Sequence, residues 1–307
     1  MTLAFISHAD CGRHDNGWNH PEHVGRIRAI TSALKYHPEL FMAMELLEGR
    51  HATEDELALC HDRGYISAVR EMSERGGGRF DADTVVSEGS WDAARAGAGS
   101  VLEAVERSLD ARNPRSFVAV RPPGHHALRA QGMGFCLFGN VAIGAKHALA
   151  RGAERVLIVD WDVHHGNGTQ ALVEDDARIH FVSMHQWPWY PGSGAAEDRG
   201  PLETVWNVPM PAGLPVQAYL DALFGAVDAA TAGWTPDLVL LSSGFDSMAR
   251  DPLGGFTLEP ADVAALTRGM VERAGRWCGG RVVSVLEGGY EPARVAEGVV
   301  AQLGALR

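Results

Sequence analysis

Five short apolar runs, rich in β-branched residues, constrain the fold of this chain more than any other feature. Each is bounded by turn residues and has the length of a buried strand; they cover residues 116–120, 155–159, 178–183, 237–241 and 281–286. Alanine-rich stretches with helical character lie between or after them, at residues 140–150, 216–232, 260–278 and 292–306. Strands that alternate with helices predict an α/β fold, with a mainly parallel sheet flanked by helices on both faces.

The first hundred residues have a more helical pattern, and we expect helices at 22–36, 54–72 and 90–109, interrupted by a glycine loop at 76–78. No low-complexity linker divides this part from the rest, and we find no repeat at a solenoid period. A length of 307 residues is large for one domain but within reach of an α/β fold. We therefore expect residues 1–307 to form one domain.

Composition and charge narrow the class of protein. Apolar residues make up 46% and charged residues 21% of the chain, close to the averages for soluble globular proteins. The net charge is -12, the only lysines are Lys35 and Lys146, and there is no basic run, so direct nucleic-acid binding is disfavoured. An acidic surface suits cationic substrates, although acidity commonly serves solubility alone.

The cysteines and the N-terminal segment indicate the compartment. Cys11, Cys60, Cys136 and Cys278 lie far apart and never form a C-x-x-C pair, which indicates free thiols in a reducing environment. Residues 1–15 contain only a short apolar run with no basic region before it, so we expect no signal peptide and no membrane span. These features predict a cytoplasmic protein.

Polar residues gather directly after four of the five predicted strands. Residues 121–126 (RPPGHH) follow the first strand and residues 160–168 (DWDVHHGNG) follow the second. Residues 242–246 (SSGFD) follow the fourth and residues 287–290 (EGGY) follow the last. Ligands of open parallel sheets bind beyond the carboxyl ends of the strands, so these four clusters should converge on one site.

The second cluster carries residues of the kind that bind metals. Along an extended segment Asp160, Asp162 and His164 share one face, and the two residues between them face the other way. Asp246 would add a further carboxylate ligand. Two carboxylates and one imidazole leave a fourth position for water, as a catalytic zinc site requires. Each of these residues alone more often caps a loop or forms an ion pair, but the joint pattern favours the metal.

The remaining clusters offer acid, base and donor groups. The Pro-Pro-Gly turn can direct both His125 and His126 to the site, where a histidine near neutral pKa could move protons. Asp160 could hold an imidazole N–H and fix its tautomer. Tyr290, after a Gly-Gly turn, could donate to a developing oxyanion, although a surface aromatic is the simpler interpretation of that residue alone.

The runs RPPGHHA, GFCLFGN, DWDVHHGNGT, SSGFD, DPLGG and LEGGY resemble the signature blocks of the histone deacetylase and acetylpolyamine amidohydrolase superfamily, in its class II-like variety. They extend over residues 121–290, and HPEHVGRIRAI near the N-terminus resembles the opening helix of that family. The resemblance implies an arginase-like α/β fold and a single zinc-dependent deacetylase domain over residues 1–307.

The same resemblance implies the roles of the site residues. One Zn²⁺ would be held by Asp162, His164 and Asp246. His126 would be the general base and acid, and His125 its electrostatic partner tied to Asp160. Tyr290 would polarise the acyl carbonyl, and Asn167 stands where class I enzymes carry an aspartate behind the second histidine.

A structural K⁺ and an acyl-lysine tunnel are also implied by the resemblance. The K⁺ ligands would be the side chains of Asp160 and Ser183 and the backbone carbonyls of Asp162, His164 and Met184. Gly134, Phe135 and Tyr190 would line the tunnel, with Trp189 as the alternative to Tyr190 and core packing as the alternative role of the aromatics. Leu253 stands at a gate where polyamine-specific relatives tend to carry glutamate.

These observations predict zinc-dependent hydrolysis of an acyl amide by metal-activated water, on an acylated lysine or a small acylated amine. An acetylpolyamine or another small amide is the alternative substrate, although an apolar Leu253 favours a peptide or a neutral amide. A two-metal ureohydrolase is a rival because Asp251 follows Asp246 closely, and a silent acyl-lysine binding module is another. The chain has neither a G-x-S-x-G nor an H-E-x-x-H motif. Homo-oligomerisation stays open.

Overall fold

A computed structural model describes residues 3–307. Its centre is one eight-stranded sheet with the order β2-β1-β5-β10-β9-β6-β7-β8, in which every neighbouring pair is parallel. The strands are β1 (Leu3–Ser7), β2 (Met44–Glu48), β5 (Arg115–Ala119), β6 (Val156–Asp160), β7 (Ile179–Gln186), β8 (Val205–Met210), β9 (Leu238–Ser243) and β10 (Val282–Leu286). A separate antiparallel pair joins β3 (Gly77–Arg79) and β4 (Val85–Ser87). The predicted α/β fold with a parallel sheet is confirmed.

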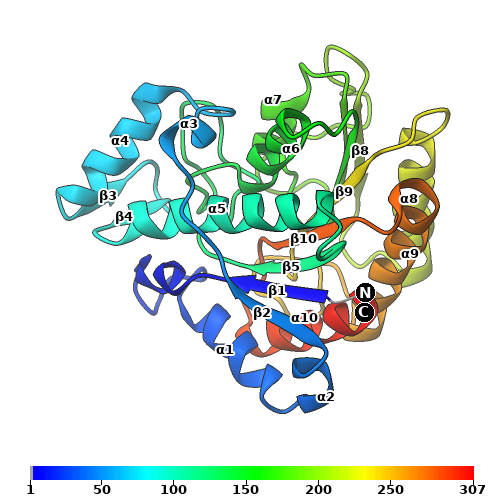
Figure 1. The fold of residues 1–307 in the computed structure, drawn as a ribbon, viewed down its shortest axis with the longest axis horizontal. Helices are drawn as coiled ribbons and strands as arrows, with labels where there is room; N and C mark the ends of the chain where they lie inside the picture. Colours follow the sequence, from blue (N-terminus) through cyan, green and yellow to red (C-terminus); the bar gives the residue numbers. More distant parts are fainter. Residues whose placement is uncertain (1–2) are drawn as a thin grey trace.

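Helices cover both faces of the sheet, so alternate strand residues enter two different cores (Figure 1). One face carries α4 (Arg63–Glu74), α5 (Ser90–Leu109), α6 (Asn140–Ala150) and α7 (Asn167–Val173). The other carries α1 (Gly25–Leu34), α2 (Pro38–Phe41), α8 (Val216–Ala230), α9 (Pro260–Cys278) and α10 (Pro292–Leu306). In β6, for example, Ile158 packs into the first core and Leu157 into the second. Burial on both faces explains why the central strands are apolar throughout.

The strongly patterned elements agree with the sequence prediction. All five predicted strands belong to the sheet, with ends shifted by a few residues. The helices predicted at 90–109, 140–150, 260–278 and 292–306 have the observed bounds of α5, α6, α9 and α10. α8 ends two residues before the predicted end at 232. Long apolar periodicity and a proline at the first turn are reliable signals because packing and local geometry agree.

The first hundred residues differ from their prediction. The helix predicted at 22–36 is limited to α1, and the one predicted at 54–72 is two helices, α3 (Glu54–Leu57) and α4. The connection between α3 and α4 is held by tertiary bonds: His61 Nε2 accepts from the Gly139 amide, and the Asp62 amide donates to the Arg129 carbonyl. The glycine segment at 76–78 is not only a loop, since β3 begins at Gly77.

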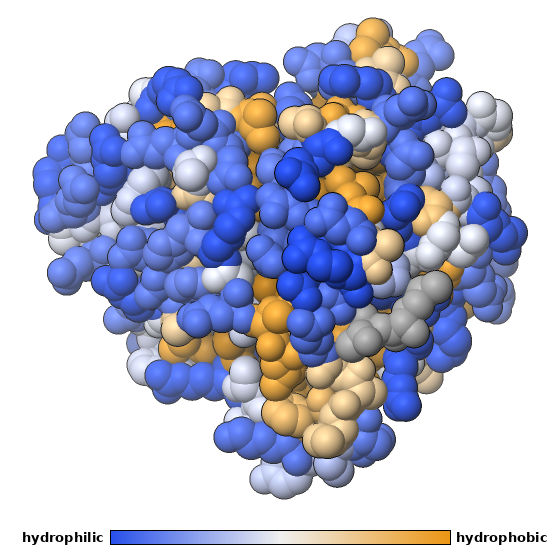
Figure 2. Space-filling view, in the orientation of Figure 1, coloured by the Kyte–Doolittle hydropathy of each residue, from blue (hydrophilic) through white to orange (hydrophobic). Residues whose placement is uncertain are grey.

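Several elements carry too weak a pattern to be predicted. They are β1, β2, β3, β4, β8, η1 (Ala9–Arg13), α2 and α7. β2 and β8 are the edges of the sheet, where one-sided burial breaks the apolar run. Leu46 on β2 is 46% exposed, and Figure 2 shows an apolar area over β2 and α2 on an otherwise largely hydrophilic face. Within residues 3–307, no helix combines the length and apolarity needed to cross a membrane.

Candidate active site

The four polar clusters follow β5, β6, β9 and β10, which are the four central strands of the sheet. Since these strands are parallel and adjacent in the order β5-β10-β9-β6, their carboxyl ends lie side by side at one edge. The predicted convergence is therefore confirmed. The side chains that it gathers are almost completely buried, although most of them are ionisable.

Asp162, His164 and Asp246 form one buried group whose ligand atoms all lie within 4.8 Å of one another. The Nδ1 atom of His164 faces both carboxylates, at 3.0 Å from Asp162 Oδ1 and 3.3 Å from Asp246 Oδ2. One N–H can satisfy only one of them, and Asp246 Oδ2 is left without a hydrogen bond. A buried carboxylate oxygen without a donor is costly, so the two carboxylates and the imidazole have the ligand composition of a cation site.

The loop after β6 sets the direction of these side chains. It is a series of bends and not an extended strand, because the amides of Asp162 and His164 turn back to the side chains of Asp160 and Asp162, both at 3.0 Å. Trp161 and Val163 still face the opposite way, into the hydrophobic core. The expected separation of polar and apolar residues holds, but turn hydrogen bonds produce it instead of strand alternation.

The loop after β10 passes very close to the carboxylates. The Gly288 amide donates to Asp162 Oδ2 at 2.8 Å. A Cβ atom at Gly288 would lie 2.0 Å from Asp246 Oδ2 and 2.4 Å from Asp162 Oδ2, so no side chain fits there. Glycine at this position lets the backbone approach the site and bring in Tyr290.

His125 and His126 differ in their hydrogen-bond partners. The Nδ1 atom of His125 lies 3.0 Å from Asp160 Oδ2, a carboxylate, whereas Nδ1 of His126 lies 2.7 Å from Asn167 Oδ1, a neutral amide. Each Nδ1 therefore carries the proton, and each Nε2 is directed away from its partner. The two rings lie 3.9 Å apart, and both are buried.

The same surroundings separate the pKa values of the two rings. Burial disfavours the charged form of both, but the nearby charges of Asp162 and Asp160 outweigh burial and raise the pKa of His125. For His126, burial together with the charges of His125 and His164 outweighs the opposing charge of Asp162 and lowers its pKa. Two adjacent histidines thus favour opposite protonation states.

Charge crowding also shifts the acidic groups. Burial and the neighbouring Asp162 charge raise the pKa of Asp246 to about 7. Burial opposes ionisation of Asp162 too, but the charge of His125 and the hydrogen bond to His164 bring its pKa well below the usual range. Burial, with Asp246 and Asp162 nearby, raises the pKa of Tyr290, so the phenol stays a neutral donor.

A pocket of about 360 Å³ opens onto this edge of the sheet. Its lining includes His126, His164 and Tyr290 together with all four residues predicted to contact the substrate: Gly134, Phe135, Tyr190 and Leu253. The sequence prediction missed His20, Pro21 and Asp83, which also line the pocket. Asp83 lies far from the signature motifs, whereas His20 and Pro21 open the HPEHVGRIRAI run, which had not been assigned to the pocket; the fold brings all three to its mouth.

The aromatic walls of the pocket are placed by unusual backbone geometry. Gly134 and Phe135 both have positive φ angles, 55° and 69°. A Cβ at Gly134 would lie 2.4 Å from the His126 ring, so glycine is required there. The Phe135 ring packs edge-on against Tyr290 at 5.6 Å, and the Tyr190 ring packs edge-on against His126 at 5.1 Å. A bulky residue in the left-handed region is strained, which is typical of functional sites.

Trp189 and Tyr190 take different parts in the pocket. Tyr190 lies near the pocket floor, with ring contacts to both His126 and His164. Trp189 lies beside Leu253 and donates its indole N–H to the Leu253 carbonyl at 2.8 Å. The geometry thus favours Tyr190 as the wall near the reacting groups, and it assigns Trp189 to the rim.

The predicted potassium ligands also lie together. Asp160 and Ser183 are paired across β6 and β7, and Met184 follows on β7. The Ser183 hydroxyl lies 3.1 Å from His185 Nδ1 and accepts from the Gly166 amide at 3.5 Å. This arrangement is compatible with the expected oxygen set, and potassium binding stays a prediction.

A buried salt-bridge cluster behind the site was not predicted. It consists of Glu22, Arg26 and Arg121, all with fully buried side chains. Glu22 accepts from Arg121 at 2.6 and 2.7 Å and from Arg26 at 3.1 Å. Arg26 also donates to the Glu287 and Gly289 carbonyls and so holds the loop that carries Tyr290. The sequence did contain a signal for this cluster, because Glu22 and Arg26 belong to the HPEHVGRIRAI run.

The same loop is fixed from a second side by Glu287. Its carboxylate accepts from the amides of Gly124 and His125, at 2.7 and 3.1 Å. Burial raises the pKa of Glu287 to about 7, opposed by the charge of His125. Glu287 therefore joins the loop of the two histidines to the loop of Tyr290.

The fold and the site define a class of α/β protein in which carboxylates and an imidazole lie beneath an aromatic pocket. Comparison of this chain with known proteins identifies its family. Residues 20–306 match the family profile described as "Histone deacetylase domain". An uncharacterized protein of Synechocystis sp. is 42% identical over 304 residues, which cover 98% of each chain. The polyamine deacetylase HDAC10 of Homo sapiens is 37% identical over 322 residues, 97% of this chain and 47% of that protein.

A solved structure supports the same assignment. The crystal structure of the HDA15 HD domain has a TM-score of 0.94 and 34% sequence identity to this chain, and the match covers 99% of this chain and 88% of that one. The chain therefore belongs to the histone deacetylase family of amide deacetylases. The resemblance seen in the motifs is confirmed at the level of family and fold.

Proposed function

We propose that this chain removes an acetyl or other short acyl group from a lysine-type amine, and that Asp162, His164 and Asp246 hold one catalytic zinc ion. The observation that carries the proposal is the unsatisfied Asp246 Oδ2 beside an imidazole shared by two carboxylates at the pocket floor. When bound, zinc supplies a Lewis acid that polarises a carbonyl and lowers the pKa of water.

His126 is the proposed general base and acid. Its Nδ1 proton is held by Asn167, so Nε2 is free to take a proton from the attacking water and pass one to the leaving amine. His125 is held by the Asp160 carboxylate and serves as its electrostatic partner. The same His126 ring thus serves both the attack of water and the departure of the amine, beside the charge held by His125 and Asp160.

Tyr290 is the proposed donor to the oxyanion. Its ring lines the pocket, and burial raises the pKa of the hydroxyl, which stays protonated. A positioned neutral donor stabilises a tetrahedral intermediate more than a planar amide. The closely packed Phe135 and the backbone of the Gly288 turn hold the ring in place.

The pocket supports a linear acylated amine as substrate. Phe135 and Tyr190 offer apolar walls for a methylene chain, and Gly134 keeps the passage open beside His126. Leu253 at the rim supplies no charge for a second amine, so we favour an acyl-lysine peptide. A small acetylated amine is the second candidate, because one relative is named a polyamine deacetylase.

Two rival functions are disfavoured by specific contacts. The oxygens of Asp251 accept from the amides of Leu253 and Tyr290, at 2.9 and 2.7 Å, so this residue is occupied and is a poor ligand for a second metal. Among the described residues, Asp251 does not belong to the group of possible metal ligands that Asp162, His164 and Asp246 form. A silent binding module would need neither the carboxylates nor the tyrosine in this arrangement.

The remaining expectations are part of the same proposal. We propose residues 1–307 as one zinc-dependent deacetylase domain, with K⁺ held by oxygens of Asp160, Ser183 and Met184 and the carbonyls of Asp162 and His164. Cytoplasmic location is supported by four free, buried cysteines. The proposal leaves the oligomeric state open, and no nucleic-acid partner is expected.

The test is metal removal and replacement on a panel of substrates. The purified chain is stripped with a chelator, resupplied with zinc or manganese, and assayed on acetyl-lysine peptide, longer acyl-lysine peptides and acetylated polyamines. We expect one zinc per catalytic site to restore activity, greatest on the acetyl-lysine peptide, and hydroxamates to inhibit. Full activity in the stripped protein would contradict the proposal. A preference for an acetylated polyamine would make that class, and not the acyl-lysine peptide, the substrate.

A further inference from the structure

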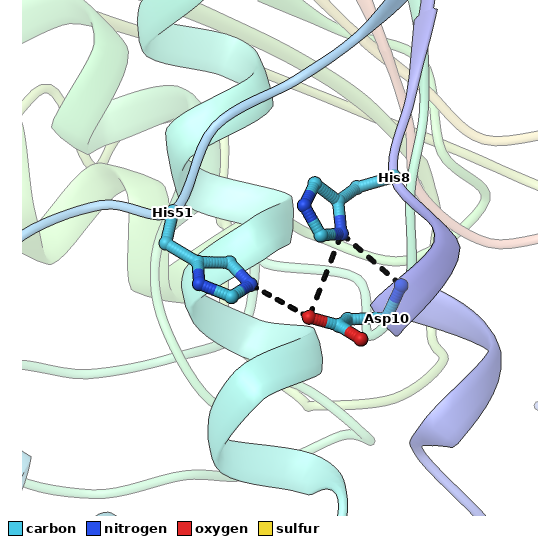
Figure 3. A group of neighbouring side chains, drawn as sticks. All are labelled: His8, Asp10 and His51. Carbon is cyan, nitrogen blue, oxygen red and sulfur yellow. Dashed lines mark hydrogen bonds and ion pairs between the residues drawn. The ribbon is translucent and has the colours of Figure 1, made fainter.

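A second group of metal-ligating side chains lies away from the pocket (Figure 3). His8 directly follows β1, Asp10 lies in η1, and His51 lies between β2 and α3. Two segments that are distant in sequence, residues 8–10 and the β2–α3 connection, therefore bring two imidazoles and one carboxylate to one point. None of the three belongs to the pocket or to the proposed catalytic groups.

The three side chains converge on one oxygen atom. His51 Nε2 lies 2.8 Å and His8 Nδ1 lies 3.7 Å from Asp10 Oδ2. The two rings are 4.7 Å apart and inclined by 37°, and one ligand atom from each residue lies within 4.8 Å of the others. Ligand atoms bound to one zinc at about 2.0–2.1 Å stand roughly 3.3 Å apart, so small side-chain movements suffice.

We propose that His8, Asp10 and His51 bind a divalent transition metal of the zinc class. Two imidazoles and one carboxylate suit zinc, nickel or cobalt, whereas calcium and magnesium prefer oxygen ligands. The side chains of His8, Asp10 and His51 are 15%, 23% and 30% exposed, so an ion can reach them and water can complete the coordination.

The surroundings can tolerate the added charge. Arg13 lies 3.5 Å from the other oxygen of Asp10, but it also pairs with Asp92 at 2.6 Å, so its charge is shared. The Asp10 amide donates to His8 Nδ1 at 3.1 Å, and a metal would replace that bond. A hydrogen bond of this kind stabilises the fold far less than metal coordination does.

A second cluster of similar composition is already neutralised by an arginine side chain. Glu56, Glu106 and His147 also bring ligand atoms together. Arg50 pairs with Glu56 at 2.7 Å and with Glu106 at 3.0 Å, which supplies the positive charge already. In the His8–Asp10–His51 group, Arg13 lies against the other oxygen of Asp10 and also pairs with Asp92, so it does not bridge the ligand atoms as Arg50 does.

A metal there would clamp the start of the chain to the β2–α3 connection. The residues after His8 continue into the segment whose Cys11 and His14 carbonyls accept from Arg121. Binding to the folded state alone adds stability that grows with metal concentration. The expected effect is a structural clamp, so zinc should raise the melting temperature with little change in kcat.

The test is equilibrium dialysis of the full chain against zinc, followed by metal analysis. We expect two zinc ions in the wild type, one in His51→Ala and one in Asp246→Ala. The His37→Ala control removes a histidine whose side chain forms an exposed ion pair with Glu39, and it should keep both ions. Asp246→Ala reports on the proposed catalytic site alone, so failure there is distinguishable from failure at His51.

Folding and geometry are checked separately. Circular dichroism and size-exclusion chromatography establish that each variant is folded, and His51→Gln replaces His51→Ala if the alanine variant is not. The zinc-dependent rise in melting temperature seen in Asp246→Ala should disappear when His51→Ala or His8→Ala is added. Wild-type stoichiometry in His51→Ala, or an unchanged melting response in the double variants, would overturn the proposal.

Discussion

Two buried groups of charged side chains meet the 287–290 loop, and they are built differently. The Glu22–Arg26–Arg121 cluster is fully hydrogen-bonded, with Glu22 between two guanidinium groups and spare donors directed to backbone carbonyls. In the Asp162–His164–Asp246 cluster the donors are shared unevenly: Asp162 Oδ1 accepts two hydrogen bonds, and Asp246 Oδ2 accepts none. The first composition stabilises a fold, and the second costs stability and suits a ligand.

The largest effect is expected from Asp246→Asn, which keeps the size of the side chain but removes a ligand charge. Zinc should be lost from the catalytic site and deacetylation should fall to background. Metal analysis and turnover on an acetyl-lysine peptide measure both. The matched control is Asp228→Asn, which removes a surface partner of Arg273. An active, zinc-loaded Asp246→Asn would mean that the cluster is not the metal site.

Glu22→Gln should act on stability instead. Breaking a buried ion pair leaves uncompensated charge, here on two arginines, and typically costs about 3–5 kcal/mol. Urea unfolding followed by circular dichroism gives the change in unfolding free energy. Glu39→Gln, at an exposed ion pair, should change it by less than about 1 kcal/mol. If Glu22→Gln and Glu39→Gln were equally stable, the Glu22–Arg26–Arg121 cluster would not stabilise the fold. The contrast with the Asp162–His164–Asp246 cluster would then fail.

Tyr290→Phe should reduce kcat by roughly 10²–10³, about 2.7–4 kcal/mol, because a donor to the oxyanion is lost. Zinc content and KM should change little, since the ring and all proposed ligands remain. Steady-state kinetics with metal analysis tests this. Tyr219→Phe alters a tyrosine buried in the core and should leave kcat near the wild-type value. A normal kcat in Tyr290→Phe would return Tyr290 to a packing role.

The two clusters should also differ in acid. Burial raises the pKa of Glu22, but Arg121 and Arg26 outweigh it and bring the pKa to about 2, below the ordinary 4.5. Its contribution is therefore fully present above about pH 4.5 and is lost as the pH falls toward 2, for a total of about 3 kcal/mol. Neutral His14 lies 3.6 Å from Glu22, and burial lowers its pKa to about 4, so it too destabilises the fold in acid.

The measurement is the difference in unfolding free energy between wild type and Glu22→Gln, followed from neutral pH into acid. We expect the difference to shrink as the pH falls through the range in which Glu22 is protonated, because groups away from Glu22 are common to both proteins and cancel; His14, which lies beside Glu22, is the exception. A difference that stays constant with pH would show that Glu22 does not stabilise the fold through its charge.

The smallest effect is expected at the rim. Leu253→Glu places a carboxylate at the mouth of the pocket, where a second amine of an acetylated polyamine would pass. A partly exposed ion pair contributes up to about 1 kcal/mol, so kcat/KM for the polyamine relative to the peptide should rise by up to about fivefold. Leu253→Gln controls for polarity without charge. An equal rise in both variants would rule out the charge as the cause.

The site could be predicted in part because its members follow strands. The apolar runs before Asp160, Ser242 and Glu287 are buried on both faces, which identifies them as central strands. The polar residues that follow each run must then lie at the carboxyl edge of the sheet. The partners His20 and Asp83 carry no such marker, since they reach the pocket from loops of the first hundred residues. Edge strands and short helices of that region depend on contacts that no local pattern encodes.

The sequence by itself determined the class of fold, the family and the set of polar residues at the strand ends, because local periodicity and residue chemistry are written along the chain. Only the tertiary structure decided which carboxylates share His164, which histidine has a charged partner and which a neutral one, and that Trp189 lies at the rim. These are properties of pairs of residues distant in sequence. Their distances, and the burial that shifts their pKa values, exist only once the sheet has brought the strand ends together.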